Sequence, residues 1–228
     1  MNSFIEKITT LGKSFYGLII YFSITYIFNF VLKALPINNK FQYNILLSVC
    51  EITTLLLLII VFRKRLKKDF IDFDKNYKKY LKLGFTVWFF GLIVMTISNN
   101  IIYHFITTSG PANQGAAVNI INNYPLYSVF SMILIGPFIE EIVFRLSFKN
   151  ALKNKKVYYI LSVLIFTSLH ALNGMNTSLA LIYFLPYGSL AFALSYILDK
   201  TDNIFTTVII HSIHNAISFV LIAMTSML

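Results

Sequence analysis

The stretch GPFIEEIVFRLSF, from Gly136 to Phe148, places two adjacent glutamates and an arginine in an otherwise apolar run. An unpaired charge in apolar surroundings costs several kcal/mol or more. Glu141 and Arg145 are four residues apart on one expected helix, so they can pair along one face. Glu140 lies about 100 degrees around that helix from Glu141 and is free to face another helix or a cavity. The stretch therefore predicts a helix that carries charged groups into the interior of a bundle.

The rest of the chain is also strongly apolar. It is 57% hydrophobic and only 12% charged, which is more apolar surface than a soluble domain of 228 residues can bury. Sections of it stay apolar for about 20 residues, the length that crosses a bilayer core. We therefore predict an all-α fold, a polytopic transmembrane helix bundle of about seven spans. The spans are expected near residues 14–35, 41–62, 80–103, 125–148, 157–173, 177–198 and 204–227.

We expect two parts in the chain. Residues 1–123 would hold the first three spans and a basic cytoplasmic loop, and residues 124–228 would hold four spans that carry the functional site. The first span follows lysines as a signal peptide does, but its apolar run is too long and no cleavage site follows, so a retained signal anchor is expected. Cys50 is the only cysteine, which excludes an intrachain disulfide.

The 19 Lys and Arg residues are unevenly distributed. Nine lie in residues 63–82 and five in residues 145–156, whereas the segment 104–124 contains none. Basic residues collect on the cytoplasmic side of membrane proteins. We therefore predict that the N-terminus and the loops at 63–79 and 149–156 are cytoplasmic and that the C-terminus is external.

The net charge of +10 is explained by this topology, so no nucleic-acid partner is expected, and the lipid bilayer is the expected surroundings. Capture of anionic lipid or of an acidic substrate tail is the alternative role of the basic loops. The frequent Lys, Asn and Ile indicate a bacterial protein, and hence a multi-pass protein of the plasma membrane. The Gly110-Pro111 turn is expected to be a connector rather than a lid.

Other ionisable residues within the expected spans are candidates for function, because only a partner or a wet cavity makes them stable there. They are Glu51, His170, His211 and His214. Glu51 is expected to make a hydrogen bond that packs helices. The histidines and the two glutamates would supply a general base, a group that stabilises negative charge, or metal ligands.

The metal alternative stays open at this point. The His-Glu-x-x-His motif of many zinc hydrolases is absent. His211 and His214, three residues apart, would both reach one ion, but Glu140, His170 and His211 from three helices would serve as well. The cofactor is accordingly either zinc or none.

Three short patterns follow one another in the late spans. They are Glu-Glu-x-x-x-Arg at 140–145, Phe-x-x-x-His at 166–170 and His-x-x-x-Asn at 211–215. In this order they resemble the three motifs of the CPBP family, the CAAX proteases and bacteriocin-processing enzymes also called Abi proteins. The resemblance covers roughly residues 124–223.

The resemblance implies an intramembrane endopeptidase that cleaves peptide or membrane-protein substrates. Carried over, Glu140 and His170 would activate water, His211 and Asn215 would stabilise the oxyanion, and Glu141 and Arg145 would support the site. Members of the family have been described both as metalloproteases and as metal-independent glutamate proteases. A metal, if present, would be held by Glu140, His170 and His211.

The chain departs from the family pattern in two places. Many relatives have Gly after the motif arginine, where this chain has Leu146, and many have Gly-x-x-x-Gly where it has Ala191 and Ser195. Small residues at that spacing still allow helices to approach closely.

The expected depths of the candidate residues in the membrane differ. Counted at 1.5 Å per residue from the cytoplasmic ends, Glu140 would lie about 10 to 12 Å deep but His170 about 20 Å. The two meet only if the fifth helix starts above the membrane, tilts, or borders a deep wet cavity.

Two other classes of function are compatible with these residues. A bacteriocin immunity factor or a scaffold for a sensor would use the same residues only to fasten helices. A proton-coupled transporter would use Glu51, Glu140 and the histidines as a relay, but such folds show inverted repeats that are absent from this sequence.

Overall fold

The computed structural model describes residues 2–35, 39–108, 112–172 and 177–226, and within these ranges all regular structure is helical. The predicted all-α bundle is thereby confirmed. In chain order the elements are α1 (Asn2–Ala34), α2 (Lys40–Phe105), α3 (Ala112–Asn123), α4 (Pro125–Ser128), η1 (Val129–Ile135), α5 (Gly136–Glu141), η2 (Ile142–Leu146), α6 (Ser147–Ala151), α7 (Lys155–Ala171), α8 (Thr177–Ile182), α9 (Phe184–Thr201) and α10 (Ile204–Ser226).

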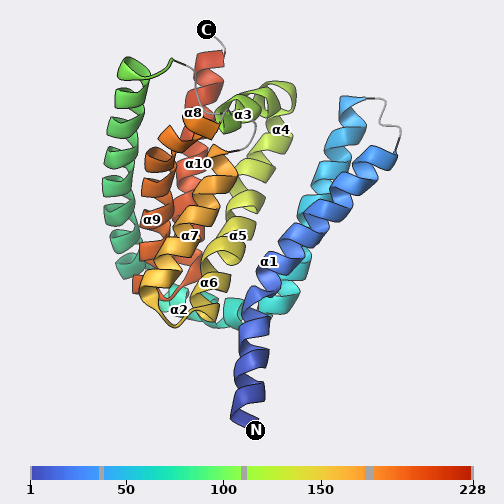
Figure 1. Cartoon of the computed structure of the whole chain (residues 1–228), viewed down its shortest axis with the longest axis vertical. Coiled ribbons are helices and arrows are strands. Elements are labelled where there is room, and N and C mark those ends of the chain that lie inside the picture. The colour runs from blue at the N-terminus through green and yellow to red at the C-terminus, as the bar shows by residue number, and fades with distance from the viewer. Residues whose placement is uncertain (1, 36–38, 109–111, 173–176, 227–228) are drawn as a thin grey trace.

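The helices run mostly along one direction, with the N-terminus at one end of the bundle and the C-terminus at the other (Figure 1). Of the helices in the described ranges, four are long and apolar enough to cross a membrane, and they lie in α1, in α2, over 180–201 and in α10. The fifth predicted span corresponds to α7, which begins at Lys155 and therefore includes part of the preceding basic segment. The chain is a multi-pass helical membrane protein.

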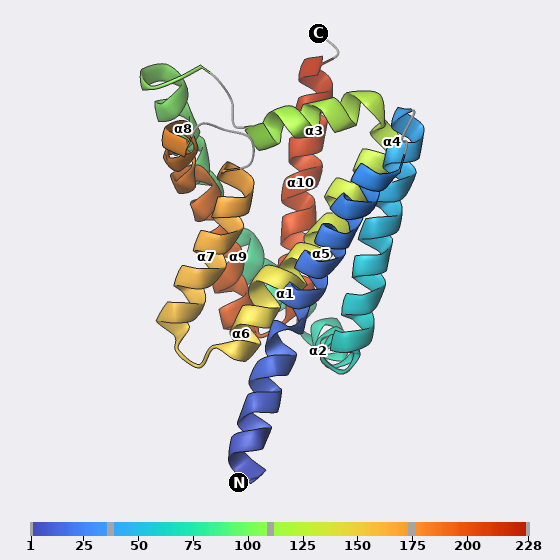
Figure 2. The same cartoon turned by 45° about the vertical axis from the view of Figure 1, so that its right-hand side comes forward.

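The connector predicted as a loop at 63–79 is helical, which corrects that expectation. α2 continues through it, so that two arms of one helix rise from a helical segment at the lower end of the bundle (Figure 2). Phe62, Leu66 and Asp69 are buried on one face of this segment. Their spacing of four and three residues is that of a helix stripe packed on a core. That packing stabilises the connector as a helix. The many basic residues of the segment hide this stripe in the sequence.

The segment 112–123, expected to lie within an external connector, forms α3, which crosses the upper end of the bundle near α10 (Figure 2). The Gly110-Pro111 turn lies outside the described residues. The predicted span 177–198 is interrupted at Tyr183, which separates α8 from α9. Small side chains bring α7 and α9 together, since Ser162 Oγ lies 3.0 Å from Ser195 Oγ and Ala191 is fully buried.

The span with the two glutamates is a rod of five consecutive helical segments, from α4 to α6, and two of them have π-helical hydrogen bonding. Gly136 donates its N–H to the carbonyl of Ser131, five residues earlier. A Cβ on Gly136 would lie 2.8 Å from that oxygen, so glycine permits the turn. Pro137 has no N–H to donate, as expected from the sequence. The rod is therefore wound irregularly just before the glutamates.

A polar clamp joins the connector of α2 to the turn between α9 and α10. Asp69 forms an ion pair with Arg65 at 2.7 Å and accepts a hydrogen bond from the backbone N–H of Ile204, the first residue of α10, at 3.1 Å. Asn203 donates to the Asp69 carbonyl at 2.7 Å. Asp69 thus satisfies a free N–H at the start of the helix that carries His211, although it belongs to another helix.

Asp202 completes the clamp in a left-handed backbone conformation, with φ of 50°. It accepts from Lys149 at 2.7 Å and from Arg65 at 2.9 Å. Burial raises the pKa of Asp202, but the hydrogen bonds from Lys149 and Arg65 outweigh burial and hold that pKa below its ordinary value. The ion pairs accordingly contribute to stability at neutral pH and are lost only as the pH falls through that lowered pKa.

Replacing Asp69 with alanine is expected to lower the free energy of unfolding by about 1–3 kcal/mol, because a buried carboxylate that pairs with Arg65 and accepts the N–H of Ile204 is removed. Thermal unfolding of the purified protein in detergent, followed by circular dichroism, measures the loss. Asp74, which is exposed on the same segment, provides the control, since Asp74→Ala should leave the unfolding temperature unchanged. Equal unfolding temperatures for the two variants would contradict the role of Asp69.

Candidate active site

The imidazoles of two helices converge on one carboxylate oxygen of a third helix. Oε2 of Glu140, in α5, lies 3.7 Å from Nε2 of His211 in α10 and 4.0 Å from Nε2 of His170 in α7. The predicted difference in depth does not keep these groups apart, because helices that cross obliquely reach one point after different numbers of residues. The side chains of Glu140 and His170 are 26% and 21% exposed, so the shared point is open on one side.

Glu141 and Arg145 lie directly behind His211. Oε1 of Glu141 is 2.8 Å from Nδ1 of His211 and 3.3 Å from Nη1 of Arg145. The side chains of Glu141 and Arg145 are both completely buried. The guanidinium of Arg145 also lies 3.7 Å from the centre of the Phe166 ring, a favourable cation–π contact. The pairing along one helix face, expected from the spacing of four, is therefore present.

Phe166 and His170 of the second motif are in direct contact. Their rings stack with centroids 4.0 Å apart, and Nδ1 of His170 lies 2.9 Å from the backbone carbonyl of Phe166. Phe166 thus lies between Arg145 and His170 and orients both. The ring of Tyr187, 5.9 Å away, borders His170 on another side.

The hydrogen-bond partners determine what the two imidazoles present to Glu140. Nδ1 of each ring faces an oxygen that can only accept, so each Nδ1 carries the hydrogen. A neutral ring then offers the lone pair of Nε2, and a protonated ring offers an N–H. The distances from Glu140 to the two Nε2 atoms exceed those of a direct hydrogen bond, so neither imidazole is hydrogen-bonded to this oxygen.

The cluster contains two carboxyl groups, on Glu140 and Glu141, and one guanidinium, on Arg145. His211 contacts both carboxyl groups, through Nε2 to Glu140 and through Nδ1 to Glu141. Its imidazole therefore links the exposed glutamate to the buried ion pair.

Asn215, on α10, lies one helical turn beyond His211 and therefore on the same face. Its side-chain amide donates to the backbone carbonyl of Met132 in η1 at 2.8 Å. An amide has two N–H groups, so one remains for another acceptor. The structure therefore places Asn215 between the π-helical turn and the histidine face.

The structure separates His214 from the other candidates. Nδ1 of His214 faces Nε1 of Trp88 in α2 at 3.4 Å, and the side chain packs in the interior on that side. His211 and His214, considered from the sequence as joint metal ligands, have different partners in this structure, Glu141 for His211 and Trp88 for His214. Trp88 was missed from the sequence, since nothing in its spacing linked it to the third motif.

Glu51 makes the packing hydrogen bonds expected of it. Its Oε1 accepts from Ser131 at 2.6 Å and from Tyr127 at 3.1 Å, and both donors lie on the rod that carries Glu140. These two hydroxyl residues were also missed, because a Ser or Tyr in an apolar span gives no sign of its partner.

The site does not fit a metal ion as its atoms lie. In the described part of the chain, no group of three His, Cys, Asp or Glu side chains is placed so that it could hold one. In the set Glu140, His170 and His211, Oε2 of Glu140 lies 3.7 Å from Nε2 of His211 and 4.0 Å from Nε2 of His170.

The fold and the cluster together define a polytopic membrane protein with a Glu/His site built from late helices. Residues 122–217, which include all three motifs, match the family described as Rce1-like, type II CAAX prenyl endopeptidase. The resemblance to the CPBP family is thereby confirmed, and the matching region is similar to a family of CAAX-type intramembrane proteases.

One curated relative is the UPF0177 protein YxdF of Lactococcus lactis subsp. lactis (strain IL1403). It is 27% identical over 164 residues, which cover 69% of this chain and 86% of the relative. No solved structure matches the chain significantly.

Proposed function

We propose that this protein is an intramembrane endopeptidase in which Glu140 and His170 activate a water molecule and His211 and Asn215 stabilise the oxyanion. The observation that supports this most directly is the convergence of Glu140 with the Nε2 atoms of His170 and His211. Peptide hydrolysis needs a base for water and a donor for the oxygen that gains charge, and this cluster contains both.

The steps follow from the proton positions. A water molecule bound between Glu140 and His170 gives one proton to the Glu140 carboxylate, and its oxygen attacks the scissile carbonyl carbon. The carbonyl oxygen becomes an anion and accepts N–H groups from His211 and Asn215. Glu140 then passes its proton to the departing amine as the carbon–nitrogen bond breaks. Glu141 keeps His211 oriented and balances a positive charge on its ring, and Arg145 pairs with Glu141.

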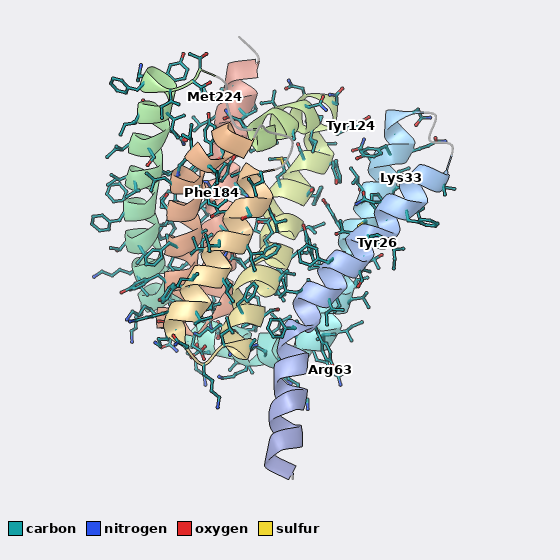
Figure 3. The ribbon with its side chains drawn as sticks, viewed as in Figure 1. Tyr26, Lys33, Arg63, Tyr124, Phe184 and Met224 are labelled. Atoms are coloured by element: carbon teal, nitrogen blue, oxygen red, sulfur yellow. The ribbon has the colours of Figure 1, made fainter. Side chains whose placement is uncertain are left out.

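The membrane orientation is part of the proposal. The basic connector of α2 and the turn between α6 and α7 lie at the same end of the bundle (Figures 1 and 2). Arg63 lies at this end, whereas Lys33 and Met224 lie toward the other (Figure 3). With the basic end in the cytoplasm, the N-terminus is cytoplasmic and the C-terminus external. Substrates would be leader-bearing peptides such as bacteriocin precursors or segments of membrane proteins.

The direct test incubates purified wild type and Glu140→Ala in detergent with a library of peptides and identifies products by mass spectrometry. Cleavage by wild type alone supports the proposal. Absence of cleavage by wild type, together with a phenotype that survives Glu140→Ala, would instead indicate a non-proteolytic immunity factor or scaffold.

A chelator should leave peptide cleavage unchanged, because the proposed mechanism draws its base and its donors from side chains. Rates are compared after prolonged incubation with EDTA or 1,10-phenanthroline and after readdition of Zn²⁺. A loss of activity that Zn²⁺ restores would overturn the metal-free mechanism, and would leave Glu140, His170 and His211 as the ligands to examine.

A further inference from the structure

Glu51 connects the first arm of α2 to the rod that carries Glu140. It receives hydrogen bonds from Ser131 and Tyr127 on a single carboxylate oxygen, at 2.6 and 3.1 Å. The other oxygen is buried and has no hydrogen-bond partner among the described residues. A carboxyl group placed within a membrane span is costly, so its retention points to a task for this link.

The hydrogen bond from Ser131 to Glu51 connects α2 to η1, a turn with π-helical hydrogen bonding. The carbonyl of Ser131 accepts the N–H of Gly136, five residues later. If Met132 followed the same pattern, its carbonyl would accept the N–H of the residue five positions later. That residue is Pro137, which has no N–H. A buried backbone carbonyl needs a partner. The partner of Met132 is the Asn215 amide, at 2.8 Å.

Glu51 and Asn215 therefore hold adjacent residues of one π-helical turn. Glu51 binds the side chain of Ser131, and Asn215 binds the backbone of Met132. An irregular turn of this kind has alternative windings of similar energy, and external contacts decide which one forms. Loss of the contact to Ser131 would free the turn and move the carbonyl that orients Asn215.

We propose that Glu51 is a positioning residue, which fixes the π-helical turn at residues 129–135 and through it aims the Asn215 carboxamide at the oxyanion. This inference rests on the proposed proteolytic function. Glu51 acts through hydrogen bonding and not through charge, because both donors use one oxygen of the carboxylate. The amide of a glutamine offers the same acceptor to Ser131 and Tyr127.

The test compares Glu51→Leu and Glu51→Gln in steady-state cleavage of a peptide that wild type cleaves. Glu51→Leu should lower kcat by about tenfold or more, because a displacement of about 1 Å can cost that much. The KM should change less than about twofold, since oxyanion contacts form only in the transition state. Glu51→Gln should retain wild-type kcat. A Gln variant as slow as the Leu variant would overturn the inference in favour of a charge or proton-transfer role.

A double-mutant cycle tests whether Glu51 works through Asn215. In an Asn215→Ala background, Glu51→Leu should lower kcat by less than about twofold, because the group that it positions is gone. Full additivity of the two losses would overturn the inference. If Glu51→Leu does not fold, Ser131→Ala, which removes only one of the two hydrogen bonds, replaces it in the same cycle.

The proposed function and this inference fail in different ways. If wild type cleaves no peptide, or if Glu140→Gln still cleaves, the proteolytic mechanism is wrong. If wild type cleaves and Glu140→Gln does not, the mechanism stands, and the kcat of the Glu51 variants alone decides the positioning role.

Discussion

Replacing Glu140 with glutamine is expected to abolish peptide cleavage, with a loss of at least about 10²–10⁴-fold in kcat, the range attributed to a general base. The amide has nearly the shape of the carboxylate but cannot accept a proton from water. Glu140 is partly exposed and its distances to His170 and His211 are longer than hydrogen bonds, so the change should leave the fold intact. Single-turnover cleavage measured by mass spectrometry determines the loss.

The control for this experiment removes a carboxylate elsewhere. Asp74, exposed on the connector of α2, is replaced with asparagine, and this variant should cleave at the wild-type rate. Expression, membrane insertion and elution in gel filtration should be equal for all three proteins. Retained turnover in Glu140→Gln would remove Glu140 from the mechanism and with it the central assignment of the site.

Replacing Arg145 with methionine is expected to destabilise the protein by about 3–5 kcal/mol, the cost of leaving one member of a buried ion pair without its partner. Glu141 and Arg145 are completely buried, and the guanidinium also lies against the Phe166 ring. Without the arginine, the buried Glu141 carboxylate would lose the cation with which it pairs. Activity should fall as well, because Glu141 would no longer hold the imidazole in a fixed orientation.

Thermal unfolding in detergent and the yield from membranes measure the effect of Arg145→Met. Arg63→Met provides a matched control, since Arg63 is exposed, and it should unfold at the wild-type temperature. Adding Glu141→Gln to Arg145→Met should recover much of the stability, because the buried charge is then removed along with its partner. No recovery in the double variant would indicate that the loss arises from packing against Phe166 and not from the ion pair.

The sequence predicted the class of fold and the convergence of the site more reliably than the details of either. Apolar runs of sufficient length indicate membrane helices, and isolated charges within them must find one another, so Glu140, His170 and His211 were expected together. Glu141 and Arg145 were expected to pair because they share a helix, where spacing alone determines proximity.

The features that were missed depend on contacts between distant parts of the chain. The bond from Asn215 to the Met132 carbonyl joins residues 83 apart, and it exists because Pro137 and a π-helical turn leave that carbonyl free. No local sequence pattern predicts such a partner. The helical structure of the connector of α2 was also not predicted from the sequence. Its many basic residues indicated only the membrane topology, whereas its buried face depends on contacts with the C-terminal half of the bundle.

The clamp at the start of α10 imposes an order on biosynthesis. Asp69 leaves the ribosome long before Ile204, its backbone partner 135 residues later. Until the last helix has been inserted, the α2 connector has a carboxylate without its final donor, and α10 is also the helix that delivers His211. Completion of the clamp therefore coincides with completion of the Glu/His cluster. A chain released before its last span would be both inactive and a substrate for membrane quality control.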